Sequence, residues 1–176
     1  EDSSRAQEAK EMRDLTVDLL NELFTYDKET GKLYWKAARQ RVTVGKEAGS
    51  VDKSGYSVLR INQKRYRTHR VVFLMHKGYL PAVLDHIDGD RANNRLENLR
   101  PATTHQNQYN RKLNKNNKSG FKGVCYHTKQ KKFLANISYQ KQRIFLGSYN
   151  TPEEADEVVR AAREELHGEF ANHGDQ

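Results

Sequence analysis

The chain has little cysteine, which excludes two kinds of structural cross-link. Its 176 residues contain one cysteine, Cys125, so no disulfide can form within the chain. A structural zinc site built on cysteine pairs is excluded for the same reason, and we expect no structural zinc. A protein without disulfides suits a reducing compartment, so a cytoplasmic setting is expected.

Apolar residues are also scarce. Hydrophobic residues make up 35% of the chain, which argues against one large core and favours two small modules joined by a polar segment. No apolar run approaches the length that spans a membrane, so no membrane partner is expected. The first residues lack the apolar core of a secretory signal, and we expect residues 1–11 to be a disordered or processed end outside the fold.

Acidic residues are absent between Glu97 and Glu153, where basic residues are frequent. Over the whole chain, 31 Lys and Arg against 23 Asp and Glu give a net charge of +8. A continuous positive field of this kind favours a polyanionic partner. Within it, residues 112–119 contain almost no apolar side chain, which predicts a basic linker.

Hydrophobic spacing predicts the elements of the first half. Leucines at helical intervals predict a short amphipathic helix over residues 12–24. Two aromatic-bearing runs at 23–26 and 32–35 flank a turn-rich break, which predicts a hairpin.

A second hairpin and a helix are predicted next. The hairpin strands are expected at 56–61 and 64–67, and the helix over 68–77, where a glycine follows its last residue. We interpret His69 and His76 on this helix as structural or surface residues, because neither has an acid at metal-ligand spacing.

The following stretch predicts a strand, a polar loop, a returning strand and a helix. A short apolar run at 83–86 predicts the first strand, and residues 88–94 predict the loop. The returning strand is expected at 96–99, stopped by Pro101. The helix is then expected to be capped by Thr103 or Thr104 and to run through His105, Asn107 and Arg111.

Four residues of this stretch supply the groups that phosphodiester hydrolysis needs. A histidine such as His86 can take a proton from water near pH 7, and Asp and Asn side chains supply oxygen ligands for a hard cation. Asn98 lies twelve positions after His86, and Asn107 lies nine positions after Asn98. A polar loop between two strands is the alternative, but Asp85, His86, Asn98 and Asn107 fit a catalytic site together.

These residues resemble the HNH endonuclease motif, in which a short hairpin and a helix grip one divalent metal ion. The resemblance implies that His86 is the general base and that Asp85 and Asn107 hold one Mg²⁺ or Mn²⁺. It implies for Asn98 the catalytic-site role of tying the loop so that His86 keeps its orientation. His105 competes for the third motif position, but two residues along a helix place it on a different face from Asn107, which we prefer.

Other charged residues near the motif have two interpretations each. Asp88 and Asp90 suggest a calcium loop, but a glycine lies between them and no Glu follows at the required position, so we interpret them as a turn. Arginines here can clamp phosphate oxygens or pair with neighbouring acids. The DNA contacts predicted outside the second module are Arg65, Arg67, Arg91, Arg95, Arg111, Lys115 and Lys118.

The second half predicts three strands and one helix. Strands are expected at 121–126, 132–139 and 143–149, and an amphipathic helix from Pro152 to about His167. Three strands packed on one helix make a minimal α+β domain. The segment resembles the AP2 DNA-binding domain in Gly120-Phe121-Lys122-Gly123-Val124, Phe145-Leu146-Gly147-Ser148-Tyr149 and Thr151-Pro152-Glu153-Glu154-Ala155.

In the AP2 family the sheet lies in the DNA major groove and its outward side chains touch phosphates and bases. Cys125 and Ser138 stand where plant members usually carry arginine, which implies a looser sequence preference. The DNA contacts implied for this chain are Lys122, His127, Asn136, Ser138 and Arg143.

The predicted fold class is therefore α+β. A ββα-metal HNH nuclease domain preceded by hairpins and a helix is expected over residues 12–111, followed by the linker at 112–119 and the AP2-like domain at 120–176. The predicted function is a metal-dependent, homing-type phage endonuclease that acts on double-stranded DNA in a bacterial host cytoplasm without a small-molecule cofactor.

One motif supplies one active centre, so nicking is preferred to double-strand cleavage, and the choice between monomer and dimer stays open. The alternative is a non-catalytic DNA-binding regulator with a degenerate nuclease fold. An RNA-binding structural protein would also be basic, and binding to duplex DNA compared with RNA would separate it.

Overall fold

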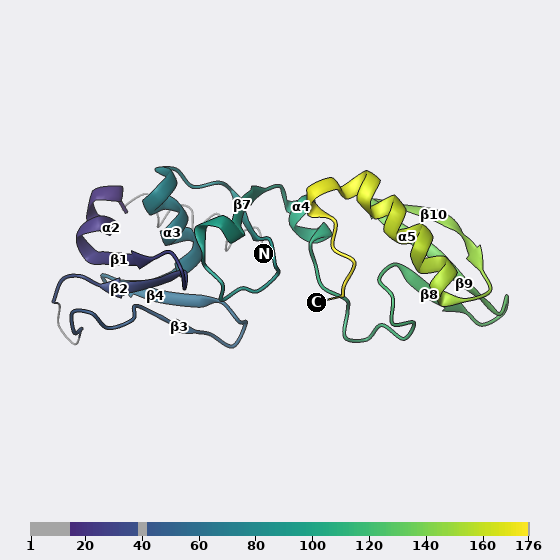
Figure 1. The fold of residues 1–176 in the computed structure, drawn as a ribbon, viewed down its shortest axis with the longest axis horizontal. Coiled ribbons are helices and arrows are strands. Elements are labelled where there is room, and N and C mark those ends of the chain that lie inside the picture. Colours follow the sequence, from purple (N-terminus) through teal and green to yellow (C-terminus); the bar gives the residue numbers. More distant parts are fainter. Residues whose placement is uncertain (1–14, 39–41, 176) are drawn as a thin grey trace. The chain divides into compact units, whose positions relative to one another are not determined.

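The structure is a computed structural model that describes residues 15–38 and 42–175, so the end expected at 1–11 lies outside the described residues. The chain forms two compact units, one up to Ala102 and one from Thr103 onward. The described residues form a mixed α/β structure with small sheets and four α-helices, labelled in Figure 1.

The first unit begins with a helix and a hairpin, both as predicted. Helix α2 (Val17–Leu23) starts where the Thr16 hydroxyl accepts a hydrogen bond from the Leu19 amide at 3.2 Å. The chain then turns directly into β1 (Phe24–Asp27), which pairs antiparallel with β2 (Lys32–Trp35). The helix was predicted over 12–24, of which 12–14 lie outside the described residues. The prediction was too long at its start, where Leu15 and Thr16 are not helical, and at its end, because Phe24 is extended and begins the strand.

The second hairpin and its helix were also predicted correctly. Strand β4 (Ser57–Ile61) pairs with β5 (Lys64–Arg67) on one side and with the short β3 (Ser50–Val51) on the other. Helix α3 (Thr68–Lys77) follows β5 at once and ends at Gly78, whose φ of 73° is the left-handed conformation that glycine adopts without strain.

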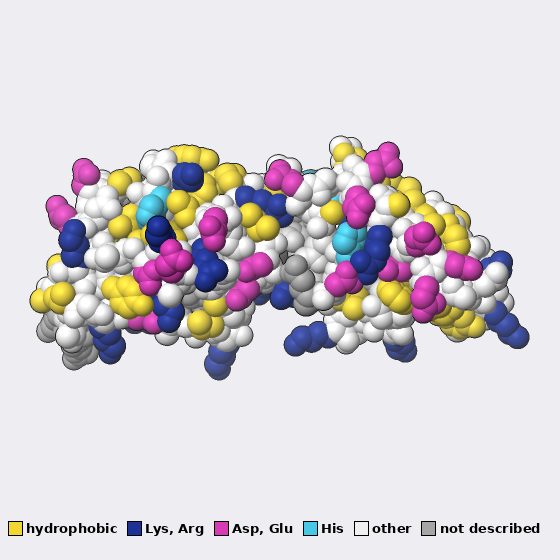
Figure 2. Space-filling view, in the orientation of Figure 1, with side chains coloured by type: hydrophobic (Ala, Val, Ile, Leu, Met, Phe, Trp, Pro, Cys, Tyr) yellow, Lys and Arg dark blue, Asp and Glu magenta, His cyan; other side chains and the backbone are white. Residues whose placement is uncertain are grey.

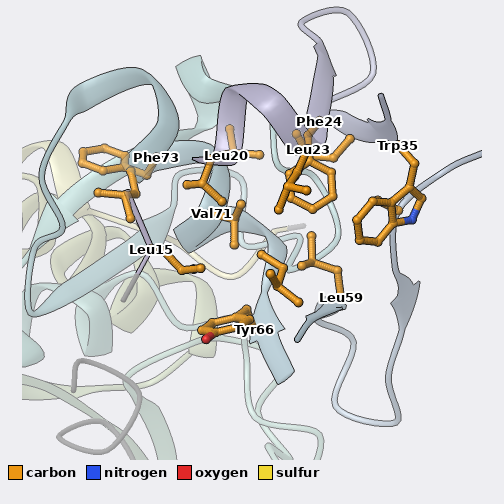
Figure 3. Packing of buried hydrophobic residues seen from close by; sticks show 14 of the residues in the cluster. Leu15, Leu20, Leu23, Phe24, Trp35, Leu59, Tyr66, Val71 and Phe73 are labelled. Carbon is orange, nitrogen blue, oxygen red and sulfur yellow. The ribbon is translucent and has the colours of Figure 1, made fainter. Parts of the chain in front are cut away.

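The core of the first unit lies between α2, α3 and the hairpins (Figure 3). Each large apolar side chain that it removes from water contributes roughly 1.5–3 kcal/mol before the entropic cost of ordering. The buried side chains labelled in Figure 3 include Leu20, Leu23, Phe24, Leu59, Tyr66, Val71 and Phe73.

A third hairpin ends the first unit, and its second strand was predicted wrongly. Strand β6 (Val83–His86) pairs with β7 (Leu99–Ala102), whereas the returning strand was expected at 96–99. Residues Leu96–Asn98 form a 3₁₀ turn instead. Pro101 does not stop the strand but lies within it, because β6 and β7 form a two-stranded sheet in which each strand has a free edge.

The second unit begins with α4 (Thr104–Tyr109). Thr103 caps this helix in a capping box with Gln106, as one of the two predicted caps. The helix ends before Arg111, two residues earlier than expected. The Tyr109 ring stacks on His167 of the same unit, with centroids 3.8 Å apart and planes 3° apart.

The rest of the second unit is a three-stranded antiparallel sheet covered by one helix. The sheet order is β10 (Gln142–Tyr149), β9 (Lys132–Tyr139) and β8 (Val124–His127). Helix α5 (Pro152–His167) lies along one face of this sheet and is followed by a 3₁₀ turn, Gly168–Phe170 (Figure 1). The first strand begins three residues later than predicted.

The segment expected to be a linker contains no helix or strand, but its side chains shape a turn. Asn117 donates to the Phe121 carbonyl at 2.9 Å, and the Ser119 hydroxyl donates to the Val124 carbonyl at 2.7 Å. These bonds tie the end of residues 112–119 to the start of β8.

Candidate active site

Strand β6 carries Asp85 and His86, the first residues of the predicted site, in a buried position. Their exposed fractions are 4% and 5%. Asp85 is paired with Arg100 across the β6–β7 hairpin, where the Arg100 Nε donates to the Asp85 carboxylate at 3.0 Å. This ion pair fixes the orientation of the Asp85 carboxylate.

The His86 imidazole is oriented by Asn94, which the sequence did not single out. His86 Nε2 lies 3.3 Å from Oδ1 of Asn94, and only an Nε2–H can donate to that oxygen. Burial lowers the pKa of His86, although the bond with Asn94 and the charge of Asp88 oppose this. The imidazole is therefore neutral near pH 7 and able to accept a proton.

The loop after β6 is cross-linked by Asn98. The Asn98 amide donates to the Asp88 carboxylate and to the Asn93 carbonyl, both at 2.9 Å, and its oxygen accepts from the Asp88 amide at 3.0 Å. The Asn93 amide also donates to Asp88 at 2.6 Å. These are the contacts that a loop-tying role for Asn98 requires. Asp88 binds side chains and amides of its own loop, in agreement with a turn.

The β1–β2 hairpin supports the same loop from outside. The Tyr26 hydroxyl accepts from the Leu96 amide at 2.8 Å. Gly31, at a φ of 71°, approaches so closely that a Cβ there would lie 2.4 Å from the Arg95 nitrogen. The Arg95 guanidinium donates to the Glu29 carbonyl. The first hairpin therefore fixes the shape of a loop about 70 positions away in the chain.

Two aromatic residues that the sequence did not connect with the site pack beside His86. The His69 ring meets the His86 ring edge to face, with centroids 4.8 Å apart. The Tyr56 ring lies 5.5 Å from His69 and 6.2 Å from His86. No local sequence signal could have indicated these contacts, because they join residues 13 to 30 positions apart through the fold.

Asn107, the third motif residue, belongs to the second unit. It lies one turn into α4, where its amide donates to the Thr103 carbonyl at 3.0 Å. His105 lies on the same helix and lines a pocket of about 400 Å³ with Thr104, Gln108, Tyr109, Ser138 and Lys141. The structure therefore brings Asp85, His86 and Asn98 together within one unit, and the metal-binding role of Asn107 stays a prediction.

The donor groups present suit one hard divalent cation. Among residues 15–38 and 42–175, no group of three or more His, Cys, Asp and Glu side chains could hold a metal ion. Mg²⁺ needs no such group, because it keeps several waters and binds proteins through one or two carboxylates together with substrate phosphates. The single carboxylate of Asp85 is a ligand of the kind that Mg²⁺ binds.

The basic residues predicted to bind DNA in the first unit have different surroundings. Arg67 and Arg91 both lie over the Tyr56 ring, 4.4 and 4.8 Å from its centroid. Arg65 instead forms an ion pair with Asp52. Figure 2 shows basic side chains over both units, interspersed with acidic ones.

Lys122 does not have the surroundings expected of a phosphate contact. Its ammonium donates to the carbonyls of Tyr109 (3.0 Å), Asn172 (2.8 Å) and Arg111. Burial and the nearby Arg163 lower the pKa of Lys122 to about 8. This lysine fastens α4 and the C-terminal segment to the sheet, so we remove it from the predicted DNA contacts.

The other contacts predicted for the second unit share one face of the sheet. Val124, Ala135 and Ile137 are buried on the α5 side. Because side chains alternate along a strand and the pairing is in register, the opposite face carries His127, Asn136, Ser138, Arg143 and Phe145. Arg111, Lys115 and Lys118 are exposed between α4 and β8.

Within the part of the chain that the structure describes, every helix is too short or too polar to cross a membrane.

Comparison with known proteins gives one family. A family model described as HNH endonuclease matches residues 66–109. An uncharacterized HNH endonuclease, L560, of Acanthamoeba polyphaga mimivirus is 33% identical over 132 residues, which cover 73% of this chain and 67% of the relative. Protein 3.8 of Escherichia phage T7 is 35% identical over 95 residues, which cover 54% of this chain and 75% of the relative. No solved structure matches.

Proposed function

The chain belongs to the HNH endonuclease family, and we propose that it is a metal-dependent endonuclease that hydrolyses phosphodiester bonds in double-stranded DNA. One observation carries the proposal: the buried Asp85-His86 pair lies beside a loop cross-linked by Asn98, within the residues that the family model matches. We propose that it is a homing-type enzyme, and a phage protein among its relatives agrees with action in the cytoplasm of a bacterial host.

In this proposal His86 takes a proton from the attacking water. Burial favours its neutral form, which a general base needs, and the contact with Asn94 orients the ring. Asn98 keeps the loop closed, so Asn94 and His86 hold their mutual orientation. A positioned base of this kind contributes about 10²–10⁴-fold to a rate.

Asp85 and Asn107 are the proposed ligands of one Mg²⁺ or Mn²⁺ ion, as the ββα-metal motif of the family implies. When bound, such an ion stabilises the charge that develops on the scissile phosphate and leaving oxygen. Arg100 holds the Asp85 carboxylate in a fixed orientation by its 3.0 Å hydrogen bond. A ligand that is already oriented loses less entropy when the ion binds.

The sheet of the second unit is proposed as an AP2-like DNA-binding module that selects the site. Its open face places Asn136, Ser138 and Arg143 beside one another, where amide and guanidinium groups can contact base edges and phosphates. One motif implies one active centre, so we propose that the enzyme nicks one strand at a time.

The proposal is tested with supercoiled plasmid and purified protein. Open-circle product is expected with Mg²⁺ or Mn²⁺, and no product with a chelator. Linear product that forms before open-circle product would contradict nicking. Binding of duplex DNA without any cleavage in either metal would favour the alternative of a non-catalytic regulator, and preferential binding of RNA would contradict a DNA substrate.

A further inference from the structure

Tyr56 stands at the centre of a group of side chains from three separate parts of the first unit. Its ring contacts His69 from α3 and His86 from β6, and two arginines lie over it. The residue itself directly precedes β4 and is half-buried. The Tyr56 ring therefore lies beside His86, the proposed general base, and also contacts the guanidinium groups of Arg67 and Arg91.

The two arginines are held close to the base. The Cζ atoms of Arg67 and Arg91 lie 4.4 and 4.8 Å from the Tyr56 centroid, distances at which a guanidinium is attracted by the ring. The Arg91 guanidinium also donates to the Ser54 carbonyl at 3.0 Å, which limits its freedom further. Two guanidinium groups against one ring repel each other, and an anion between or beside them relieves this repulsion.

His69 gives a second observation that points to a ligand. It is 3% exposed, and its Nδ1 has no hydrogen-bond partner among the described residues. A buried polar atom without a partner is rare in native proteins and is commonly satisfied by a water molecule or a bound group. This atom belongs to the ring that packs against both Tyr56 and His86.

We propose that Tyr56 is a positioning residue that holds Arg67 and Arg91 against the phosphate that is cleaved. The inference rests on the proposed endonuclease function and adds to it which cations stabilise the scissile phosphate. Both guanidinium groups lie over the Tyr56 ring, whose centroid is 6.2 Å from that of the His86 imidazole. The imidazole must in turn lie within reach of the water that attacks phosphorus. Tyr56 makes no contact with the reacting atoms and acts through the arginines.

If Tyr56 orients the two arginines, the cleavage rate should depend more on the ring of Tyr56 and the planar shape of the guanidinium groups than on charge alone. Removal of the ring in Tyr56→Leu should lower the single-turnover cleavage rate at saturating DNA about tenfold, because both cations lose their orientation. Tyr56→Phe keeps the ring and should stay within about twofold of the wild type. Arg91→Lys keeps the charge but cannot stack as a planar group, so it should be as impaired as Arg91→Gln.

The decisive experiment is a double-mutant cycle on Tyr56 and Arg91. If the ring acts through the arginine, Arg91→Gln should slow cleavage about tenfold in the wild type but less than threefold in Tyr56→Leu, roughly the non-additivity of directly coupled residues. Additive effects would overturn the proposal. Tyr79→Leu is the matched control, because this exposed ring of the same unit packs edge-on against Phe73.

The outcomes separate this inference from the function on which it rests. A wild type that never cuts DNA with metal contradicts the endonuclease assignment. If the wild type cleaves DNA and Tyr56→Leu cleaves it at the same rate, the positioning role of Tyr56 is overturned and the endonuclease function is not. If Tyr56→Leu does not fold, Arg91→Lys still decides, since its side chain is on an exposed loop and activity close to the wild type would contradict a stacked role.

Discussion

The two units of this protein hold their candidate functional side chains in opposite ways. In the first unit Asp85, His86 and Asn98 are 4%, 5% and 8% exposed and are bonded to neighbouring side chains. In the second unit the proposed DNA contacts stand on an open sheet face, where Phe145 is 60% exposed. One cation of the second unit, Lys122, is instead bonded to main-chain carbonyls.

The difference matches the different demands of cleavage and binding. A general base and a metal ligand must keep their positions to a fraction of an ångström, so they are locked by packing and hydrogen bonds. Contacts to phosphates and base edges must be accessible and tolerate small shifts of the duplex. The comparison can be tested by changing one residue of each kind.

The largest effect is expected from His86→Ala. The variant loses the proposed base, so the cleavage rate with Mg²⁺ should fall about 10²–10⁴-fold. DNA affinity, measured by a gel-shift titration, should stay close to that of the wild type, because the sheet face is unchanged. A loss of binding together with cleavage would show that the two roles are not divided between the units.

The next largest effect is expected from Lys122→Met. It tests whether this lysine of the second unit stabilises the fold instead of binding DNA. The change removes three hydrogen bonds of a charged group, and we expect the second unit to lose about 3 kcal/mol of stability. Amide hydrogen exchange in β9 measures this loss. Lys118→Met, at an exposed position, is the matched control and should leave exchange unchanged.

A smaller effect is expected when the pH is lowered, and it should concern the first unit. Burial lowers the pKa of His69 well below 6.5, and burial also lowers the pKa of His86. The unfolded chain therefore takes up protons that the folded unit does not, so stability is complete above pH 6.5 and falls as the pH drops below it. For each histidine, the free energy of unfolding falls by at most about 1.4 kcal/mol for each unit by which the pH is lowered.

Fluorescence of Trp35, the single tryptophan, reports unfolding of the first unit, in whose core it is buried. His69→Gln should flatten the pH dependence of its thermal midpoint between pH 6.5 and 5. The same slope in the variant and the wild type would contradict a neutral, buried His69.

The smallest effect is expected from Arg143→Ala on the open sheet face. One lost phosphate contact should weaken DNA binding a few-fold and lower the slope of affinity against salt concentration by about 0.9. Single-turnover cleavage at saturating DNA should be unchanged. Lys46→Ala, at an exposed position of the first unit, is the control, and an equal effect there would contradict a dedicated binding face.

Much of the fold was predictable because its signals are local. The caps Thr16, Thr103 and Thr151 each accept a hydrogen bond from the amide three residues further on, and Gly78 ends its helix by its own conformation. The β7 strand was misplaced because Leu96–Asn98 turn so that Asn98 can reach back to Asp88. That choice depends on contacts across the loop and not on the strand propensity of the residues.

The candidate site was predictable only where the family pattern fixes spacing. The sequence assigns Asp85, His86 and Asn98 to the site. It does not assign Asn94, Tyr56 or His69 to it, because their contacts to His86 arise from folding. Lys122 looks like any other lysine of the basic segment, and its three carbonyl partners lie 11, 13 and 50 positions away. Charge in a sequence indicates a cation and does not indicate whether it will be buried.

The boundary after Ala102 has a practical consequence for protein engineering. It separates Asp85 and His86 from Asn107, and a separate hydrophobic cluster lies on each side of it. A gene divided at this point would encode two fragments, each with its own core and neither with a complete HNH motif. Fused to two proteins whose association can be induced, such fragments would form a split nuclease that is inactive until the two halves are brought together.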